Sequence, residues 1–459
     1  MMSTQNKKSE SDKLISAAKV GDVLEVTAAL RAGADRETRD PARNDFSALH
    51  WSSNKGHTDV VIKLLNVGVN VDARENRGRS ALHSSCFQGY EKIARLLIGR
   101  GAIIDAVDKE EFTPLMAASQ EGHYKLVWLL IEHGAKIGLK DKIGMTSISY
   151  ASMKGNNSVI KLLAFHGANI NLKDNDGWQP IHEAASNDHH LTVEALIQLE
   201  ADINCKDKMG YTPLWMASEK GHDKVVKILL ENKANVEIKE TQGNTALSIA
   251  STNGHAATAH MLLTHGSCAN SANYLGATPL FLASQEGRDD LVTLLILYGA
   301  NIDAITNKGE TSLLTACDKG NLSTATLLIE DGANPHASDK NGNTPLKIAI
   351  KKGNRELIYL LENPPLNRLQ SLCLVQGDPG LHKEINCPTS VKSTSSASAG
   401  TSNLECVVCM DPRTSTVMTM PCRHAVTCQK CMDDMEERGD SRCPLCRTKI
   451  DQRIPIFIN

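Results

Sequence analysis

A 33-residue period runs through most of this chain and limits its possible folds more than any other feature. Two glycines recur with this period, and the second of them recurs every 33 residues from Gly56 to Gly353, with Asp188 as the one exception. Only the first step, from Gly21 to Gly56, is longer, at 35 residues, which indicates an insertion around residues 40–43. A chain with this period stacks one supersecondary unit many times. The first glycine marks the period at the following positions, with Glu111 in phase at the one gap: Gly78, Gly144, Gly177, Gly210, Gly243, Gly276, Gly309 and Gly342.

Each repeat carries its own helix signals. Ser or Thr stands two residues after the first glycine in nine of ten repeats, and Gln179 is the exception. Proline often follows, as at Pro114. A hydroxyl that caps free N–H groups, followed by a proline whose ring already fixes φ near the helical value, predicts the start of a helix. The short helix ends at glycine. A second helix carries apolar residues at i, i+1, i+4 and i+5, which predicts one buried stripe; examples are Val60, Val61, Leu64 and Leu65, and Val225, Val226, Leu229 and Leu230.

The TPL-x-x-A core of these units and their period resemble the ankyrin repeat. The resemblance covers residues 11–363, in about eleven units. It implies a mainly α fold, an ankyrin-repeat solenoid built from a helix-turn-helix and a hairpin per repeat, with a continuous core and a long concave surface. The first and last units are expected to be caps with a more polar outer face.

The resemblance also implies that a protein substrate binds the concave surface. In an ankyrin stack the residue after the first glycine projects towards the hairpin side, and several of these residues are large and apolar. Two interpretations stay open: a row of exposed side chains that a partner contacts, or side chains that cover neighbouring hairpins. The candidate substrate-binding residues are Phe46, Phe112, Met145, Trp178 and Tyr211.

Histidines also recur at the period, which raises the question of an active site within the repeats. We interpret them as hydrogen-bonding the repeat backbone, because residues at a structural period need a structural explanation first. The sequence contains no Gly-rich phosphate loop, Gly-x-Ser-x-Gly elbow or His-Glu-x-x-His helix. The recurring histidines are His50, His83, His182, His57, His123, His222 and His255.

Seven cysteines and one histidine form four close pairs near the C-terminal end of the sequence. Such a set is what two closed tetrahedral zinc sites require. The short gap after His424 favours an interleaved order over sequential filling. A disulfide framework is disfavoured by the interposed histidine and the lack of a secretory signal. We predict two zinc ions, one held by Cys406, Cys409, Cys428 and Cys431 and the other by Cys422, His424, Cys443 and Cys446.

This ligand order resembles the RING finger, a cross-braced module with two zinc ions. Fully ligated zinc cannot activate water, so such a module acts by binding. In the RING family a surface between the zinc loops binds a ubiquitin-conjugating enzyme charged with ubiquitin. The resemblance places Val408, Pro444 and, beside them, Leu445 in that apolar groove. It places Arg447 at the linchpin position, where a guanidinium contacts both the conjugating enzyme and ubiquitin.

The last residues, RTKIDQRIPIFIN, alternate as a strand would. Together with CVVCMD and MPCRHAVTCQKC they resemble the C-terminal RINGs of inhibitor-of-apoptosis proteins and of the mind bomb ligases. That likeness implies a homodimer through the tail, in which an aromatic residue, here Phe457, touches ubiquitin on the partner subunit. Pro455 departs from the pattern, because it removes one backbone donor from the strand.

Residues 364–403 lose the period and are rich in Ser, Thr, Ala and Gly, so we expect a flexible linker between the repeats and a RING domain at 404–459. The formal charge of −3 gives no basic excess, and we expect no nucleic-acid partner. No signal-peptide core and no apolar span of membrane length is visible, so we expect neither secretion nor membrane insertion. We expect a cytoplasmic protein, and no feature separates cytosol from nucleus.

These features together predict an E3 ubiquitin-protein ligase of the RING type. The repeats would bind the substrate, and the RING would promote transfer of ubiquitin to a substrate lysine without a covalent intermediate on this chain. The competing hypothesis is a non-catalytic ankyrin scaffold whose zinc finger only binds another protein. The presence of Val408, Pro444 and Arg447 favours the ligase.

Overall fold

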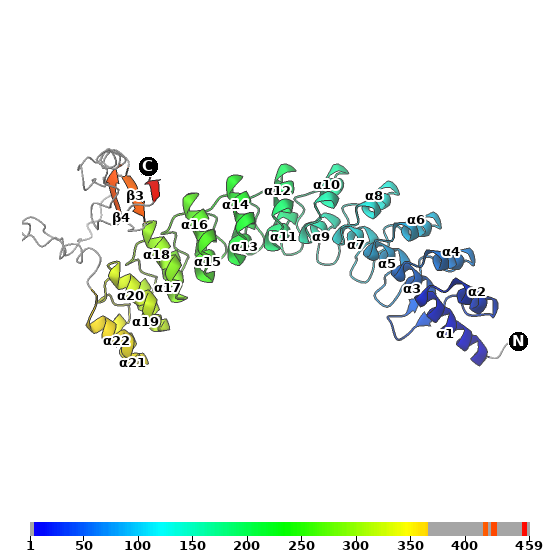
Figure 1. The fold of residues 1–459 in the computed structure, drawn as a ribbon, viewed down its shortest axis with the longest axis horizontal. Coiled ribbons are helices and arrows are strands. Elements are labelled where there is room, and N and C mark those ends of the chain that lie inside the picture. The colour runs from blue at the N-terminus through cyan, green and yellow to red at the C-terminus, as the bar shows by residue number, and fades with distance from the viewer. Residues whose placement is uncertain (1–3, 366–415, 421–423, 429–451, 457–459) are drawn as a thin grey trace, which may run out of the picture. The chain divides into compact units, whose positions relative to one another are not determined.

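The computed structural model describes residues 4–365, 416–420, 424–428 and 452–456. Within them 22 helices follow one another as eleven antiparallel pairs, and two small sheets are present (Figure 1). The fold is therefore mainly helical, as the period predicts.

The first helix of each pair belongs to an inner layer. These helices are α1 (Thr4–Val20), α3 (Ala48–Lys55), α5 (Ala81–Gln88), α7 (Pro114–Gln120), α9 (Ser147–Met153), α11 (Pro180–Ser186), α13 (Pro213–Lys220), α15 (Ala246–Asn253), α17 (Pro279–Gln285), α19 (Ser312–Lys319) and α21 (Pro345–Lys352).

The second helix of each pair belongs to an outer layer. These helices are α2 (Val23–Arg31), α4 (Thr58–Asn66), α6 (Glu91–Gly99), α8 (Tyr124–Glu132), α10 (Asn157–Phe165), α12 (His190–Gln198), α14 (Asp223–Glu231), α16 (Ala256–Thr264), α18 (Asp289–Leu297), α20 (Leu322–Glu330) and α22 (Arg355–Glu362).

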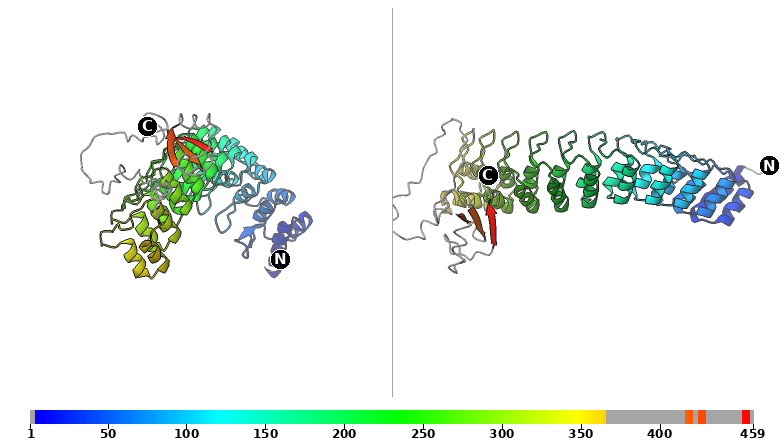
Figure 2. Two further views of the ribbon diagram at one scale, coloured as in Figure 1. Left: turned by 60° about the vertical axis from the view of Figure 1, so that its left-hand side comes forward. Right: turned by 90° about the horizontal axis from the view of Figure 1, so that it is seen from above.

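The chain divides into two compact units, the first comprising residues 1–291 and 305–307 and the second the remainder. In the first unit each inner helix from α1 to α15 packs on the next inner helix, and each outer helix from α2 to α14 packs on the next outer helix. The loops between pairs project together from one side of the helices (Figure 2). In the second unit α19 packs on α20 and α21, and α22 packs on α20 and α21.

The expected buried stripes are present. Val60, Val61, Leu64 and Leu65 are all buried in α4, and the four equivalent residues of α14 are buried too. At about 25 cal/mol per Å² of apolar surface, such stripes supply the main stabilisation of each repeat. In α22, the last helix of the described residues, only Leu357 and Leu361 are buried and Tyr359 is exposed, which fits a terminal repeat with one partner.

Helices of the inner layer begin as their caps predict. The Thr113 hydroxyl accepts a hydrogen bond from the Met116 N–H at 3.2 Å, and Pro114 occupies the first helical position. α1 differs from expectation, because it begins at Thr4 and not near residue 11. Residues 4–20 contain neither glycine nor proline, so nothing in the sequence stops the helix from extending towards the N-terminus.

The two exceptions to the glycine period keep the backbone of the residues they replace. Glu111 has φ 62° and Asp188 has φ 58°, both in the left-handed region. A non-glycine residue there costs about 1–3 kcal/mol, which the surrounding repeats must offset. The predicted insertion at residues 40–43 begins at the last residue of β1 (Arg39–Asp40) and ends before β2 (Phe46–Ser47), and the two strands pair antiparallel.

The remaining strands are β3 (Thr416–Met420), β4 (His424–Cys428) and β5 (Gln452–Ile456), in the order β4-β3-β5 with antiparallel pairing throughout. β5 is an edge strand of this sheet, and Pro455 pairs opposite Val417. Proline is tolerated in an edge strand because the missing donor can lie on the unpaired side. Residues 452–456 of the tail thus form a strand despite Pro455.

Candidate functional site

Two open depressions lie on the first unit, between the hairpins and the inner helices. One is lined by residues that include Phe46, Arg79 and Phe87 and has a volume of about 370 Å³. The other shares Arg79 and Phe87, adds Phe112 and Tyr150, and has a volume of about 360 Å³. Because Arg79 and Phe87 line both, the two depressions meet at these side chains.

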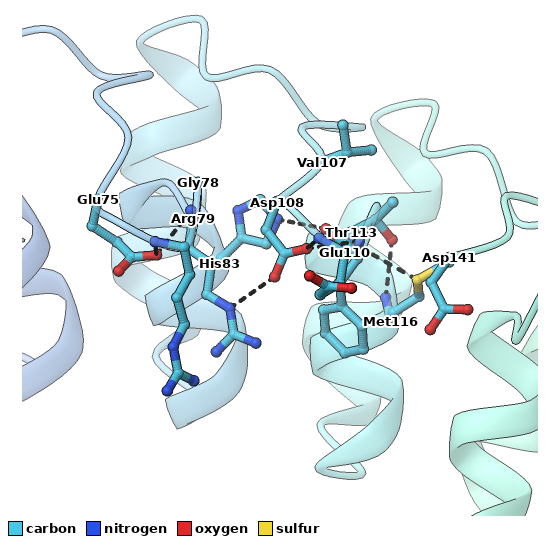
Figure 3. A network of polar contacts seen from close by, with 12 residues as sticks. Glu75, Gly78, Arg79, His83, Val107, Asp108, Glu110, Thr113, Met116 and Asp141 are labelled. Carbon is cyan, nitrogen blue, oxygen red and sulfur yellow. Dashed lines mark hydrogen bonds and ion pairs between the residues drawn. The ribbon is translucent and has the colours of Figure 1, made fainter. Parts of the chain in front are cut away.

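Arg79 is held between a carboxylate and two aromatic rings. Its Nε donates to Asp108 Oδ2 at 2.9 Å, as Figure 3 shows. Its guanidinium lies 4.6 Å from the centroid of the Phe87 ring and 5.8 Å from that of Phe112. The other Asp108 oxygen, Oδ1, accepts the N–H groups of Glu110 and Phe112 at 2.8 and 3.0 Å. The charges of this pair are therefore matched within the protein.

The candidate substrate-binding column is not uniformly exposed. Phe112 is only 6% exposed, because it stacks on Phe87 at 5.5 Å and meets Tyr150 edge-on at 5.0 Å. Met145 is 5% exposed. Of the two interpretations left open, the burial of these two residues supports the one in which they cover neighbouring hairpins.

The other three members of the column are half-buried and remain candidates for contact with a partner. The ring centroid of Phe46 lies 5.3 Å from that of Trp51, and the ring centroid of Trp178 lies 6.2 Å from that of His182. Tyr211 stacks on Trp215 at 3.9 Å. Each ring is thus fixed on one side by its own inner helix.

The recurring histidines bond the repeat backbone, as predicted. His83 is fully buried, its Nδ1 accepts the Ser80 N–H at 3.1 Å, and its Nε2 donates to the Phe112 carbonyl at 3.0 Å. His50 and His182 make the same bridges to Arg79 and Tyr211 carbonyls. Burial lowers the pKa of each to about 4, which keeps them neutral at pH 7. His57, His123, His222 and His255 contact carbonyls of the preceding repeat.

Glu183 on α11 is a functional candidate that the sequence did not indicate. It is 8% exposed, and within the part of the chain that the structure describes its carboxylate has no hydrogen-bond or ion-pair partner. Burial raises its pKa to about 7, the negative charge of Asp174 adds to the effect, and Lys220 opposes it. No period or motif marks Glu183, because the residues at its position in other repeats are mostly uncharged.

Glu183→Gln is expected to stabilise the protein at pH 8 but not at pH 5. A carboxyl whose pKa rises from 4.5 unfolded to about 7 folded costs stability progressively as the pH rises through that window, because the unfolded state releases its proton first. The full gain above pH 7 is at most about 3 kcal/mol. Urea unfolding at both pH values measures it, with Glu194→Gln on the exposed face of α12 as the control; an equal effect at both pH values contradicts the expectation.

The predicted zinc ligands lie mostly outside the described residues. Within those residues no three His, Cys, Asp or Glu side chains gather in a way that could hold a metal ion. His424 and Cys428 alone are placed, as the two ends of β4. A strand rises about 3.3 Å per residue, so their Cα atoms are about 13 Å apart. The ligand atoms of one zinc ion lie within about 4 Å of each other, so this spacing indicates that the two residues bind different ions, which the interleaved and the sequential order both allow.

Seven thiols and one imidazole fit zinc by their chemistry, since structural zinc sites use cysteine and histidine ligands. The complete assignment stays a prediction. The predicted groove and linchpin residues Val408, Pro444, Leu445 and Arg447 lie outside the described residues, as does Phe457. No described helix has the length and apolar character needed to cross a membrane.

Comparison with known families matches a family model to the repeats and another to the cysteine-rich segment. A model of ankyrin repeats (three copies) matches residues 14–108, 74–141, 101–174, 148–240, 233–306 and 290–367, which together exceed half of the chain. The chain belongs to the ankyrin-repeat family. A second model, described as zinc finger, C3HC4 type (RING finger), matches residues 402–453. This ankyrin-repeat protein therefore carries a C-terminal RING finger.

Three curated proteins resemble parts of this ankyrin-repeat protein. "Apoptosis inhibitor 1" of Orgyia pseudotsugata multicapsid polyhedrosis virus is 33% identical over 84 residues, 18% of this chain and 29% of that protein. "Putative E3 ubiquitin-protein ligase RF298" of Arabidopsis thaliana is 44% identical over 50 residues, 11% and 6% of the two chains. "MND1-interacting protein 1" of Arabidopsis thaliana is 42% identical over 57 residues, 12% and 8%. The matches span less than a third of each relative.

Proposed function

We propose that this ankyrin-repeat protein is a RING-type E3 ubiquitin-protein ligase. The observation that carries the proposal is the RING finger matched at residues 402–453, joined in one chain to repeats that have no enzyme motif of their own. One of the similar proteins is named as a ligase, which supports the same function. The repeats bind a protein substrate, and the RING binds a ubiquitin-charged conjugating enzyme.

The proposed division of labour follows from the chemistry of the two parts. Zinc with four protein ligands offers no open coordination position, so it shapes a binding surface and does not act on substrate. Val408, Pro444 and Leu445 provide the apolar groove for the conjugating enzyme. Arg447 holds the thioester and ubiquitin in a reactive arrangement, which lowers the barrier by restricting motion. The substrate lysine then attacks the thioester carbonyl, and the conjugating enzyme's cysteine leaves.

The tail adds a second part to the proposal. β5 pairs with β3 of its own chain and is an edge strand of the described sheet. Two RINGs pair through their tails, and Phe457 of one chain contacts the ubiquitin held by the other. Exposed strand edges readily accept a further chain, which supports this arrangement.

Reconstitution tests the ligase. The full-length protein is incubated with activating enzyme, a panel of ubiquitin-conjugating enzymes, ubiquitin and ATP. Formation of ubiquitin chains that residues 1–365 alone do not support is the expected result. If no conjugating enzyme in the panel gives chains, the protein is the non-catalytic scaffold.

A further inference from the structure

Glu183 occupies a position of the repeat that lines an open depression elsewhere in this protein. The residue four places after the N-cap of the inner helix lines a depression in four other repeats: Ser84 and Tyr150 in the first unit, and Thr315 and Ile348 in the second. Glu183 follows its N-cap Gln179 at the same interval, one period after Tyr150. Its carboxylate oxygens are not fully enclosed, and they keep the small solvent contact that the residue has.

The charge of Glu183 is not matched by a cation, in contrast with two acidic groups that line the depressions. Asp108 is paired with Arg79, and Asp318 is paired with Lys352, each at 2.9 Å. The cation that acts on Glu183 is Lys220, but its ammonium donates to the carbonyl and hydroxyl oxygens of Ser186 at 2.7 and 2.8 Å. A buried carboxylate without a partner is costly and is retained at sites that bind.

The surroundings of Glu183 combine negative charge with aromatic rings. After burial, the negative charge of Asp174 in the preceding hairpin also disfavours its ionisation. Burial and the hydrogen bond to Asp141 raise the pKa of Tyr150 on α9, and the negative charge of Glu183 adds to that effect. In the next repeat burial raises the pKa of Tyr211, and the negative charges of Glu240, Glu219 and Asp207 raise it further. Anionic groups and half-buried rings both favour a cation, the rings through their negative faces. Lysine and arginine offer a cation on an apolar stem, which suits both.

We propose that Glu183 is the subsite for a lysine or arginine side chain of the bound protein, which docks as a basic peptide segment with apolar flanks across Trp178 and Tyr211. The claim that this protein is a ubiquitination substrate rests on the proposed function, whereas the binding itself does not. An incoming cation ionises Glu183 fully and gives it the partner that the repeats lack.

Selection from a random peptide library displayed on phage, with the full-length protein as bait, tests the proposal. Peptides enriched in Lys or Arg next to apolar residues are expected, and the same selection on Glu183→Gln loses them. Enrichment of acidic or uncharged peptides, no enrichment, or basic peptides that also bind the variant would overturn it.

A synthetic copy of the most enriched basic peptide gives the size of the effect by calorimetry. Glu183→Gln is expected to weaken its binding about 10- to 100-fold, as loss of a desolvated charge pair does. Glu194→Gln on α12 removes the same charge from the outer layer and should leave the affinity unchanged. Trp178→Ala with Tyr211→Ala should weaken binding about tenfold. Equal affinity for wild type and Glu183→Gln contradicts the subsite, and equal affinity for the ring variant contradicts the docking path.

The two proposals fail separately. Discharge of ubiquitin from a charged conjugating enzyme to free lysine needs no bound substrate, so it reports on the RING alone. A protein that discharges ubiquitin but binds no basic peptide refutes the Glu183 subsite and keeps the ligase. One that binds the peptide through Glu183 but discharges no ubiquitin keeps the subsite and refutes the ligase.

Discussion

Arg447→Ala is expected to lower the rate of ubiquitin discharge about 100-fold while both zinc ions stay bound. Arg447 follows the last predicted ligand, Cys446, and the resemblance to RING fingers makes its guanidinium the group that contacts conjugating enzyme and ubiquitin together. Removing one preorganised donor from a reacting complex costs a factor of about 10²–10³. Single-turnover discharge to free lysine measures the rate without any dependence on substrate.

Arg447→Lys separates geometry from charge. Lysine keeps the positive charge but lacks the planar fork of donors that contacts two proteins at once. Its rate is therefore expected to lie much nearer to that of the alanine variant than to wild type. Zinc content equal to wild type shows that the RING is intact in both variants. Wild-type discharge by Arg447→Ala would remove Arg447 from its assigned role.

Much of the fold follows from the sequence because each repeat specifies itself. The hydroxyl of Thr113, the ring of Pro114 and the glycine after the helix act within a few residues of each other, so their effects can be read locally. The stripe of Val60, Val61, Leu64 and Leu65 is likewise a property of one helix. The sequence also marks the two off-period residues, Glu111 and Asp188, although only the backbone shows that both keep a positive φ.

The recurring carboxylates of the hairpins have a structural role that the backbone hydrogen bonds explain. Asp108, Asp141, Asp174, Asp207 and Asp339 recur at the period, and each accepts the N–H groups of the residues two and four places later. Glu75 and Glu240 do the same with a longer side chain. A recurrent acidic residue before the first glycine therefore indicates a hairpin whose backbone the side chain closes.

Burial across repeats could not be predicted in the same way. Phe112 is covered by Phe87 from the preceding repeat and Tyr150 from the following one, and the period says nothing of which side chains occupy those positions. Glu183 is buried for a similar reason, since α11 lies between α9 and α13. The residues that decide exposure on the candidate surface are thus the non-repeating ones, which carry no pattern.

Removal of zinc is expected to abolish ubiquitin transfer while leaving the ankyrin repeats folded. A segment of about fifty residues buries too little apolar surface to fold alone, and each structural zinc ion supplies on the order of 10 kcal/mol. The four tryptophans, Trp51, Trp128, Trp178 and Trp215, all lie in the repeats. Their fluorescence should therefore be unchanged by a chelator that stops ubiquitin discharge. Discharge that survives chelation contradicts the role of zinc in the RING.

Counting the ions in paired variants tests which ligands share an ion. In the interleaved order His424 and Cys446 hold the same ion, so His424→Ala with Cys446→Ser removes one ion and leaves the other. His424→Ala with Cys409→Ser removes one ligand from each site, so neither ion stays bound. Sequential filling predicts the reverse, because His424 would then share an ion with Cys409. Elemental analysis of the two paired variants gives the answer, and more zinc in the His424 and Cys409 pair would refute the interleaved order.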